Sequence, residues 1–174
     1  MTGKGHRLTG VGAGFFAAAF VHVLGFSYSA EAIAALAAAF STTLPDLIEI
    51  PIYKRGARTR TLIPHRTITH WPPLWFGIMY GAYYYLEPYY ACALIGMSVG
   101  ALAHILADAP NPLGIPWVLP HKRIALFGGL WRSGENEKMM VTVFTLFGVG
   151  SWLYAHQNTV AGQYLTHLWV WLWT

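Results

Sequence analysis

The stretch Pro64–His70, with the sequence PHRTITH, places two histidines five residues apart beside an arginine, directly before the apolar run Trp71–Leu86. A second cluster, HILAD at His104–Asp108, closes the next apolar run. Residues four apart lie on one face of a helix, so His104 and Asp108 are expected to be neighbours. The two clusters matter together because the topology of the chain predicts that both lie at the same end of a helical bundle.

The composition indicates a membrane protein with a single domain over residues 1–174. Hydrophobic residues make up 55% of the chain and charged residues only 10%, whereas soluble domains carry about 25% charged residues. A soluble domain of this composition would lack polar surface. The single cysteine, Cys92, excludes an intrachain disulfide framework and a cysteine-rich zinc site.

Five apolar runs predict helices that cross the bilayer, since a span needs about 20 residues. Pro45 should end or kink the second helix, and the tail Ala161–Thr174, rich in tryptophan, predicts a helix at the membrane interface. The predicted fold is an all-α, polytopic membrane bundle of about five spans plus this interfacial helix. The five runs are Leu8–Phe26, Ala30–Leu44, Trp71–Leu86, Tyr89–Ala107 and Met139–Ala155.

The basic residues predict how this bundle is oriented. With five spans, every Lys and Arg falls in segments on the face that carries the N-terminus, while the opposite turns carry only Glu31 and Glu87. Under the positive-inside rule the basic face, and with it the N-terminus, is cytoplasmic. The basic residues are Lys4, Arg7, Lys54, Arg55, Arg58, Arg60, Arg66, Lys122, Arg123, Arg132 and Lys138.

Side chains of the kinds that bind metals gather next to that face from segments far apart in the sequence. Imidazole together with carboxylate suits zinc, manganese, iron or nickel, and bundles build metal sites from inward side chains on facing helices. Taken singly, each residue also has a structural interpretation, such as a helix cap for Asp46 or a core hydrogen bond for His104. The candidates are His6, Asp46, Glu49, His65, His70, His104, Asp108 and Glu137.

The remaining histidines have simpler interpretations. His22, His156 and His167 are predicted to be packed or interfacial residues, and His121, beside two basic residues, is predicted to be solvated. The five-residue spacing of the paired histidines, with no acid between them, does not match the His-Glu-x-x-His zinc-protease motif. The second of the pair, His70, is expected at the start of the third span.

The order of these motifs along the chain resembles one bacterial family, the YdjM-like inner-membrane proteins, which are described as metal-dependent hydrolases and also as LexA-binding proteins. The similarity extends from residue 5 to about residue 140. The motifs that carry it are Gly5-His6, Leu44-Pro45-Asp46, His65-Arg66 with Thr69-His70, His104 to Asp108, Gly114-Ile115-Pro116 with Pro120, and Gly134 with Glu137.

The resemblance implies a hydrolase of the bacterial inner membrane that holds one or two divalent ions, zinc first, with manganese or iron as alternatives. His6 would complete the ligand shell or act as general base, Arg66 would bind an anionic oxygen, and Glu137 is a weaker catalytic match. The usual second acid is replaced by Ile48, and Thr67 and Trp71 also depart from the pattern, so one ion and two ions both stay open. The implied metal ligands are His6, Asp46, His65, His70, His104 and Asp108.

Three functional hypotheses follow. The first is hydrolysis of an ester or phosphoester at the cytoplasmic face, with a lipidic substrate because the site would lie at head-group depth. The second is a non-catalytic membrane protein that binds a protein partner and uses the His/Asp cluster as a structural metal site. A transporter is the weakest, because few ionisable residues lie between the interfaces and no repeated broken helices are visible. No direct nucleic-acid binding is expected.

Overall fold

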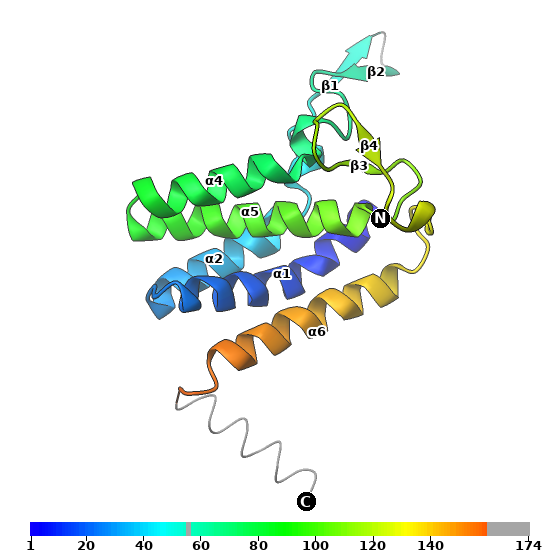
Figure 1. Cartoon of the computed structure of the whole chain (residues 1–174). Coiled ribbons are helices and arrows are strands. Elements are labelled where there is room, and N and C mark those ends of the chain that lie inside the picture. Colours follow the sequence, from blue (N-terminus) through cyan, green and yellow to red (C-terminus); the bar gives the residue numbers. More distant parts are fainter. Residues whose placement is uncertain (55–56, 160–174) are drawn as a thin grey trace, which may run out of the picture.

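The computed structural model describes residues 1–54 and 57–159, and over these residues the chain is a bundle of α-helices with small hairpins at one end (Figure 1). The predicted all-α class is confirmed, because helices make up most of the described chain. The helices are α1 (Gly3–Val23), α2 (Tyr28–Ser41), α3 (Leu44–Leu47), α4 (Pro72–Tyr85), α5 (Pro88–Asp108) and α6 (Glu137–Ala155).

The connections on the N-terminal side of the bundle contain short strands where the sequence predicted loops. Strands β1 (Pro51–Lys54) and β2 (Ala57–Thr61) pair in an antiparallel hairpin, and β3 (Ile115–Pro116) pairs with β4 (Arg123–Ile124). Two 3₁₀ turns, η1 (Ile68–His70) and η2 (Leu126–Gly128), complete the elements. In Figure 1 both hairpins lie at the end of the bundle that carries the N-terminus.

Helix α1 begins earlier than its predicted start at Leu8. The side chain of Thr2 caps it by accepting a hydrogen bond from the backbone N–H of Gly5, at 3.3 Å. An N-cap of this kind satisfies one of the free N–H groups of the first turn. The earlier start matters for the site, because His6 then lies on a helix and is buried.

Small residues let helices α1, α2 and α5 pack with their backbones close together. A Cβ atom at Gly96 or Gly100 would collide with backbone oxygens of α2, and one at Gly10 with the carbonyl of Ala39. The hydroxyl of Ser41 adds a hydrogen bond to the carbonyl of Met97 on α5, at 3.1 Å. Helix α5 therefore lies in the core of the bundle, and α4 packs against it.

Helix α6 is attached to the bundle mainly through α1. A Cβ at Gly148 would collide with the backbone of Gly12, and one at Gly12 with the carbonyl of Phe144. Within α6, which is described in full, Gly148 is the buried residue, while apolar side chains such as Leu146 and Phe147 are more than 60% exposed. This apolar surface suits contact with lipid.

Among the residues that the structure describes, two helices, α5 and α6, are long and apolar enough to cross a membrane, so the predicted five spans are not confirmed. Helices α2 and α4 have 14 residues each, which is about 21 Å, against a hydrocarbon core of about 30 Å. Helix α1 is long enough, but its first turns carry Lys4, His6 and Arg7. The predicted interfacial helix at Ala161–Thr174 lies outside the described residues.

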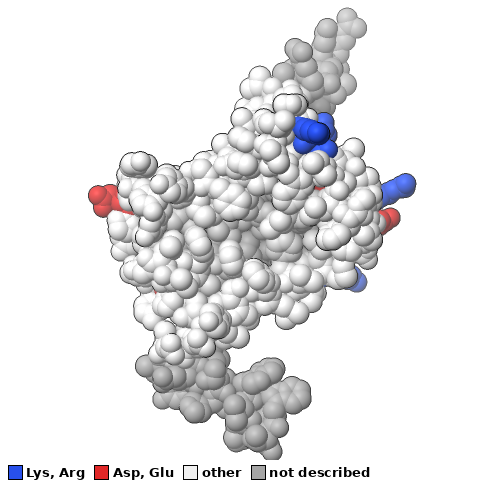
Figure 2. Space-filling model, in the orientation of Figure 1, with Lys and Arg blue, Asp and Glu red and all other residues white. Residues whose placement is uncertain are grey.

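On the face shown in Figure 2, the charged side chains of the described residues lie toward the ends of the molecule. Figure 2 shows blue basic side chains at the end that carries the N-terminus and the hairpins, whereas the long middle of the helices is white. This distribution matches the apolar composition of the helices and leaves polar groups at two separate ends.

Candidate metal centre

Ligand-type side chains from five parts of the chain converge at the N-terminal end of the bundle. They form two groups, Asp46, Glu49, His65 and His70 in one and His6, His104 and Asp108 in the other, and within each group one ligand atom per residue lies within 4.8 Å of the others. The Nε2 atoms of His70 and His104, which are 3.2 Å apart, connect the groups. All six residues that the resemblance implied as ligands are therefore brought together.

Hydrogen bonds on the outer sides of His70 and His104 determine which ring nitrogens carry protons. The Nδ1 of His104 lies 2.8 Å from the carbonyl oxygen of Thr42 and therefore donates to it. The Nδ1 of His70 lies 3.1 Å from the hydroxyl oxygen of Thr69, which itself donates to Glu49, so Nδ1 donates to that hydroxyl; Oε1 of Glu49 lies 3.3 Å away. In both neutral rings the inward Nε2 then presents a lone pair, and the two lone pairs point into the same space.

Asp46 supplies a third electron-pair donor to this space. Its Oδ1 lies 3.4 Å from Nε2 of His70 and 3.7 Å from Nε2 of His104. Lone pairs that face one another with no proton between them repel, and a cation placed among them removes this repulsion. Four-coordinate zinc with bonds of about 2.1 Å needs ligand atoms about 3.4 Å apart, so these three residues fit a divalent ion.

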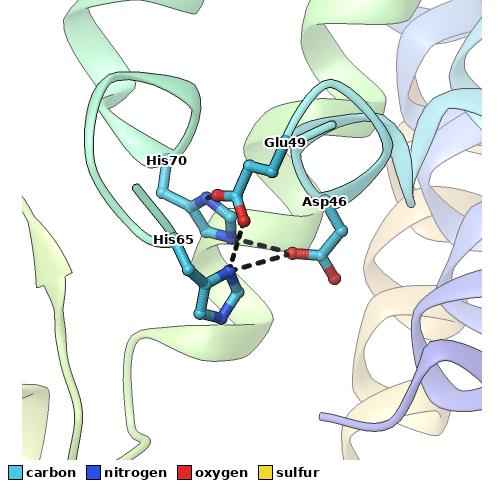
Figure 3. A group of neighbouring side chains, drawn as sticks. All are labelled: Asp46, Glu49, His65 and His70. Carbon is cyan, nitrogen blue, oxygen red and sulfur yellow. Dashed lines mark hydrogen bonds and ion pairs between the residues drawn. The ribbon is translucent and has the colours of Figure 1, made fainter. Parts of the chain in front are cut away.

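His65 reaches the same group from the loop before η1, as predicted (Figure 3). Its Nδ1 lies 2.6 Å from Oε2 of Glu49 and 3.7 Å from Oδ1 of Asp46. The side chains of His65 and Asp46 are 47% and 43% exposed, whereas His70 is fully buried. The group is therefore open on the side of His65.

Glu49 is the residue whose part in the site the motif comparison missed, because the family pattern put the second acid at position 48. Its buried carboxylate accepts hydrogen bonds from the backbone N–H of Arg66, at 3.1 Å, and from the hydroxyl of Thr69, at 2.9 Å. Together with its contacts to His65 and His70, this makes Glu49 a positioning residue for both imidazoles. Glu49 was among the candidates predicted from the residues themselves, since it lies three residues after Asp46, but the family motif left it out of the implied ligand set.

The charges of this group move the pKa values of its members apart. Burial acts to raise the pKa of Asp46, but the hydrogen bond with His70 and the nearby imidazoles outweigh it and hold that pKa below its usual range. The pKa of Glu49 is lowered in the same way, against burial, by His65 and His70. Burial acts to lower the pKa of His70, yet Asp46 and Glu49 raise it. A metal ion therefore competes with a proton held by His70.

His6 and Asp108 extend the centre on the far side of His104. The ring of His6 stacks on that of His104 with centroids 3.8 Å apart, and its Nε2 lies 3.3 Å from Oδ1 of Asp108. The Nδ1 of His6 is buried and has no hydrogen-bond partner among the described residues. Asp108 also binds the guanidinium of Arg66 and the amino group of Met1. His6 thus keeps one nitrogen available to a ligand or a proton.

The other two predicted catalytic residues occupy different positions. Arg66 is buried with a positive φ of 56°, which is uncommon for a non-glycine residue. Its Nη1 donates to the carbonyl of Gly114, and its Nε has no partner within the described chain. Glu137 instead accepts hydrogen bonds from the backbone N–H and hydroxyl of Thr2. Glu137 therefore anchors the start of α1 and lies outside the two ligand groups.

An apolar cavity of about 420 Å³ lies between α1, α4, α5 and α6. Its lining includes Phe16, Pro72, Ile105, Trp117 and Phe144. Pro72 comes two residues after one inward histidine, and Ile105 follows the other. Ligand pockets of about 300–1,000 Å³ are typical for small molecules, and the lining of this one suits a hydrocarbon chain.

Replacing Glu49 with glutamine is expected to weaken metal binding by about 10- to 100-fold, the range typical of residues that orient metal-binding histidines. The amide can still accept a hydrogen bond, but it removes the charge that fixes the two imidazoles. The measurement is a zinc titration of purified protein against a competing chelator. Glu87→Gln, at an exposed position in the α4–α5 turn, serves as the control, and equal affinities for both variants would contradict the positioning role.

Comparison with known proteins identifies one match. The sequence model of a family described as YdjM inner membrane protein matches residues 1–174, the whole chain. The match includes the tail beyond about residue 140, which the motifs did not cover. No curated protein and no solved structure matches the chain.

Proposed function

The chain belongs to the YdjM inner membrane protein family, and we propose that it is a membrane-embedded, metal-dependent hydrolase that acts on an ester or phosphoester. The observation that carries this proposal is the arrangement of Asp46, His70 and His104. With both imidazole rings neutral, the three ligand atoms face one another at 3.2–3.7 Å with their lone pairs directed inward. Three protein ligands with an open side are typical of catalytic rather than structural zinc sites.

The proposed topology keeps five helices in the membrane, α1, α2, α4, α5 and α6, with the N-terminus in the cytoplasm. The basic side chains at the N-terminal end support this orientation under the positive-inside rule. The exposed apolar face of α6 supports contact with lipid. In this arrangement the metal centre lies at the cytoplasmic interface, which is the membrane face where the sequence predicted it.

Each residue of the centre has a part in the proposed reaction. Asp46, His70 and His104 hold the ion, with His65 as the exposed fourth candidate, and Asp108 orients His6. A bound divalent ion would supply a Lewis acid that activates water and polarises the scissile bond. The unpartnered Nδ1 of His6 can take up a proton, and the unpartnered Nε of Arg66 can donate to an anionic oxygen. Zinc fits this donor set first, with manganese or iron as alternatives.

A lipidic substrate is supported by the apolar cavity between the helices. The cavity is large enough for part of an acyl chain, and its lining residues Pro72 and Ile105 closely follow His70 and His104 in the sequence. Hydrocarbon burial contributes about 0.8 kcal/mol for each methylene group. The cavity would therefore select a substrate whose polar bond lies at the metal centre and whose chain extends between the helices.

The test is hydrolysis of chromogenic esters and phosphoesters of increasing chain length by the full-length protein in detergent. We expect activity that a chelator abolishes and zinc or manganese restores, with kcat/KM rising by up to about fourfold for each added methylene until the cavity is full. Activity that survives the chelator, or no activity in the presence of any of these metals, would contradict the proposal.

The second candidate function is a non-catalytic membrane protein in which the centre is structural. The buried pairing of Arg66 with Asp108, which closes one side of the centre, favours it. A structural site is coordinatively closed, so exchangeable ligands on the bound metal distinguish the two functions. Cobalt-substituted protein whose absorption spectrum changes on addition of azide would favour the hydrolase.

A further inference from the structure

A second group of imidazoles and a carboxylate lies at the opposite end of the bundle. His22 is in the last turn of α1, Glu31 is in the first turn of α2, and His156 follows α6 directly. His6 and His22 lie on the same helix, sixteen residues apart, which corresponds to about 24 Å. This group is therefore separate from the centre described above. The sequence predicted His22 and His156 to be only packed or interfacial residues.

The three side chains meet around a buried carboxylate. Oε1 of Glu31 lies 2.6 Å from Nδ1 of His22, and Oε2 lies 2.9 Å from Nε2 of His156. Glu31 is only 5% exposed and His156 only 3%. The two imidazole rings stack with centroids 4.0 Å apart, and the ring of Trp152 covers the other face of His156. A buried carboxylate is stable only when other groups compensate its charge.

The hydrogen bond made by Nδ1 of His156 determines which nitrogen of the neutral ring carries the proton. Its Nδ1 lies 2.9 Å from the carbonyl oxygen of Trp152 and therefore donates to it. In the neutral ring, Nε2 then presents a lone pair to Oε2 of Glu31. Two acceptors at 2.9 Å in a buried position require a cation between or beside them. The same arrangement of outer donor and inward lone pair occurs at His70 and His104.

We propose that His22, Glu31 and His156 form a second metal site, for zinc or a similar divalent transition metal. One ligand atom from each of His22, Glu31 and His156 lies within 4.8 Å of the other two. Two histidines and one glutamate are an established zinc ligand set. The ligands come from three helical segments, so the ion links the end of α6 to α1 and α2.

This link acts on a helix that is attached to the bundle mainly through one neighbour. Helix α6 packs along α1, through the close backbone approach at Gly148 and the stacked rings of Phe16 and Phe147. An ion that binds only the packed arrangement stabilises that arrangement by mass action. The second site thus makes the docking of α6 depend on metal at the face of the membrane opposite the hydrolytic centre.

The test uses a double variant that keeps the hydrogen bonds to Glu31 and removes the ligands, His22→Asn with His156→Gln. The side-chain nitrogens of asparagine and glutamine stand near the positions of histidine Nδ1 and Nε2, so both can donate to Glu31, but amides are poor zinc ligands. Full-length protein in detergent is equilibrated with zinc, desalted and analysed for metal content. We expect the double variant to hold one equivalent of zinc less than the wild type, and the control His121→Gln to hold the wild-type amount.

A second measurement covers the case in which the double variant does not fold. In a His70→Asn/His104→Asn background, which lacks the first centre, zinc should still raise the midpoint of thermal unfolding, and adding the His22→Asn/His156→Gln substitutions should remove that rise. Equal zinc contents in wild type and double variant would overturn the proposal. So would the absence of a zinc effect in the background variant. The charge of Glu31 would then be compensated by a protonated His156 instead of a metal ion. Neither result depends on hydrolytic activity.

Discussion

Replacing His104 with asparagine is expected to lower the zinc affinity of the first centre by more than about 100-fold, beyond the loss typical for a positioning residue. Asparagine keeps a donor near the position of Nδ1, so the hydrogen bond to the carbonyl of Thr42 can survive. It removes Nε2, one of the three lone-pair donors in the centre. The measurement is a zinc titration with a competing chelator. The helix content of the variant is measured as well, to show that it is folded.

Two controls separate loss of the ligand from loss of the fold. His104→Ala removes the ligand and also leaves the buried Thr42 carbonyl without its donor, which costs about 1–3 kcal/mol of stability. It should therefore lose metal and unfold more easily, whereas the asparagine variant should lose only metal. His121→Asn, at an exposed loop position, should change neither. Wild-type affinity in His104→Asn would remove the basis of the proposed hydrolase.

The second large effect is expected from replacing Gly148 with alanine. The added Cβ would meet the backbone of Gly12, which cannot move aside as a flexible side chain can. Overpacking of this kind costs about 1–3 kcal/mol, more than the roughly 1 kcal/mol that alanine gains over glycine in a helix. We expect a lower free energy of unfolding in detergent and separation of α6 from α1.

Gly150→Ala is the matched control on the same helix. A Cβ at position 150 would have no described atom within 4 Å, so the variant gains helix propensity without a clash and should be as stable as the wild type or slightly more stable. The two variants differ only in the contact with α1. Equal stabilities would show that the close approach of α1 and α6 does not hold the bundle together.

Much of the bundle could be predicted because the helices are marked by strong local signals. The predicted runs before and after Glu87 correspond closely to α4 and α5, where prolines open both helices. The convergence of His6 with His70 and His104 followed from topology alone, since helices of alternating direction bring those segments to one end. The roles of these residues as metal ligands stay predictions.

Other features depend on contacts that sequence spacing does not encode. The site at Glu31 requires that α6 pack along α1 and end beside it, and nothing near His156 in the sequence indicates this. The part played by Glu49 depends on how the chain turns after α3. The five predicted spans are not confirmed, because apolar composition marks a helix more clearly than its length, as the 14 residues of α2 show.

The shortness of α2 and α4 has a consequence for the lipids around them. Each is about 9 Å shorter than the hydrocarbon core, and each adjoins a segment that carries a ligand of the first centre, Asp46 after α2 and His70 before α4. With the bundle in a bilayer as proposed, the leaflet beside these helices has to thin. Thinning draws the glycerol layer inward, so that the ester groups of neighbouring lipids reach the depth of the metal centre while their chains remain in the membrane.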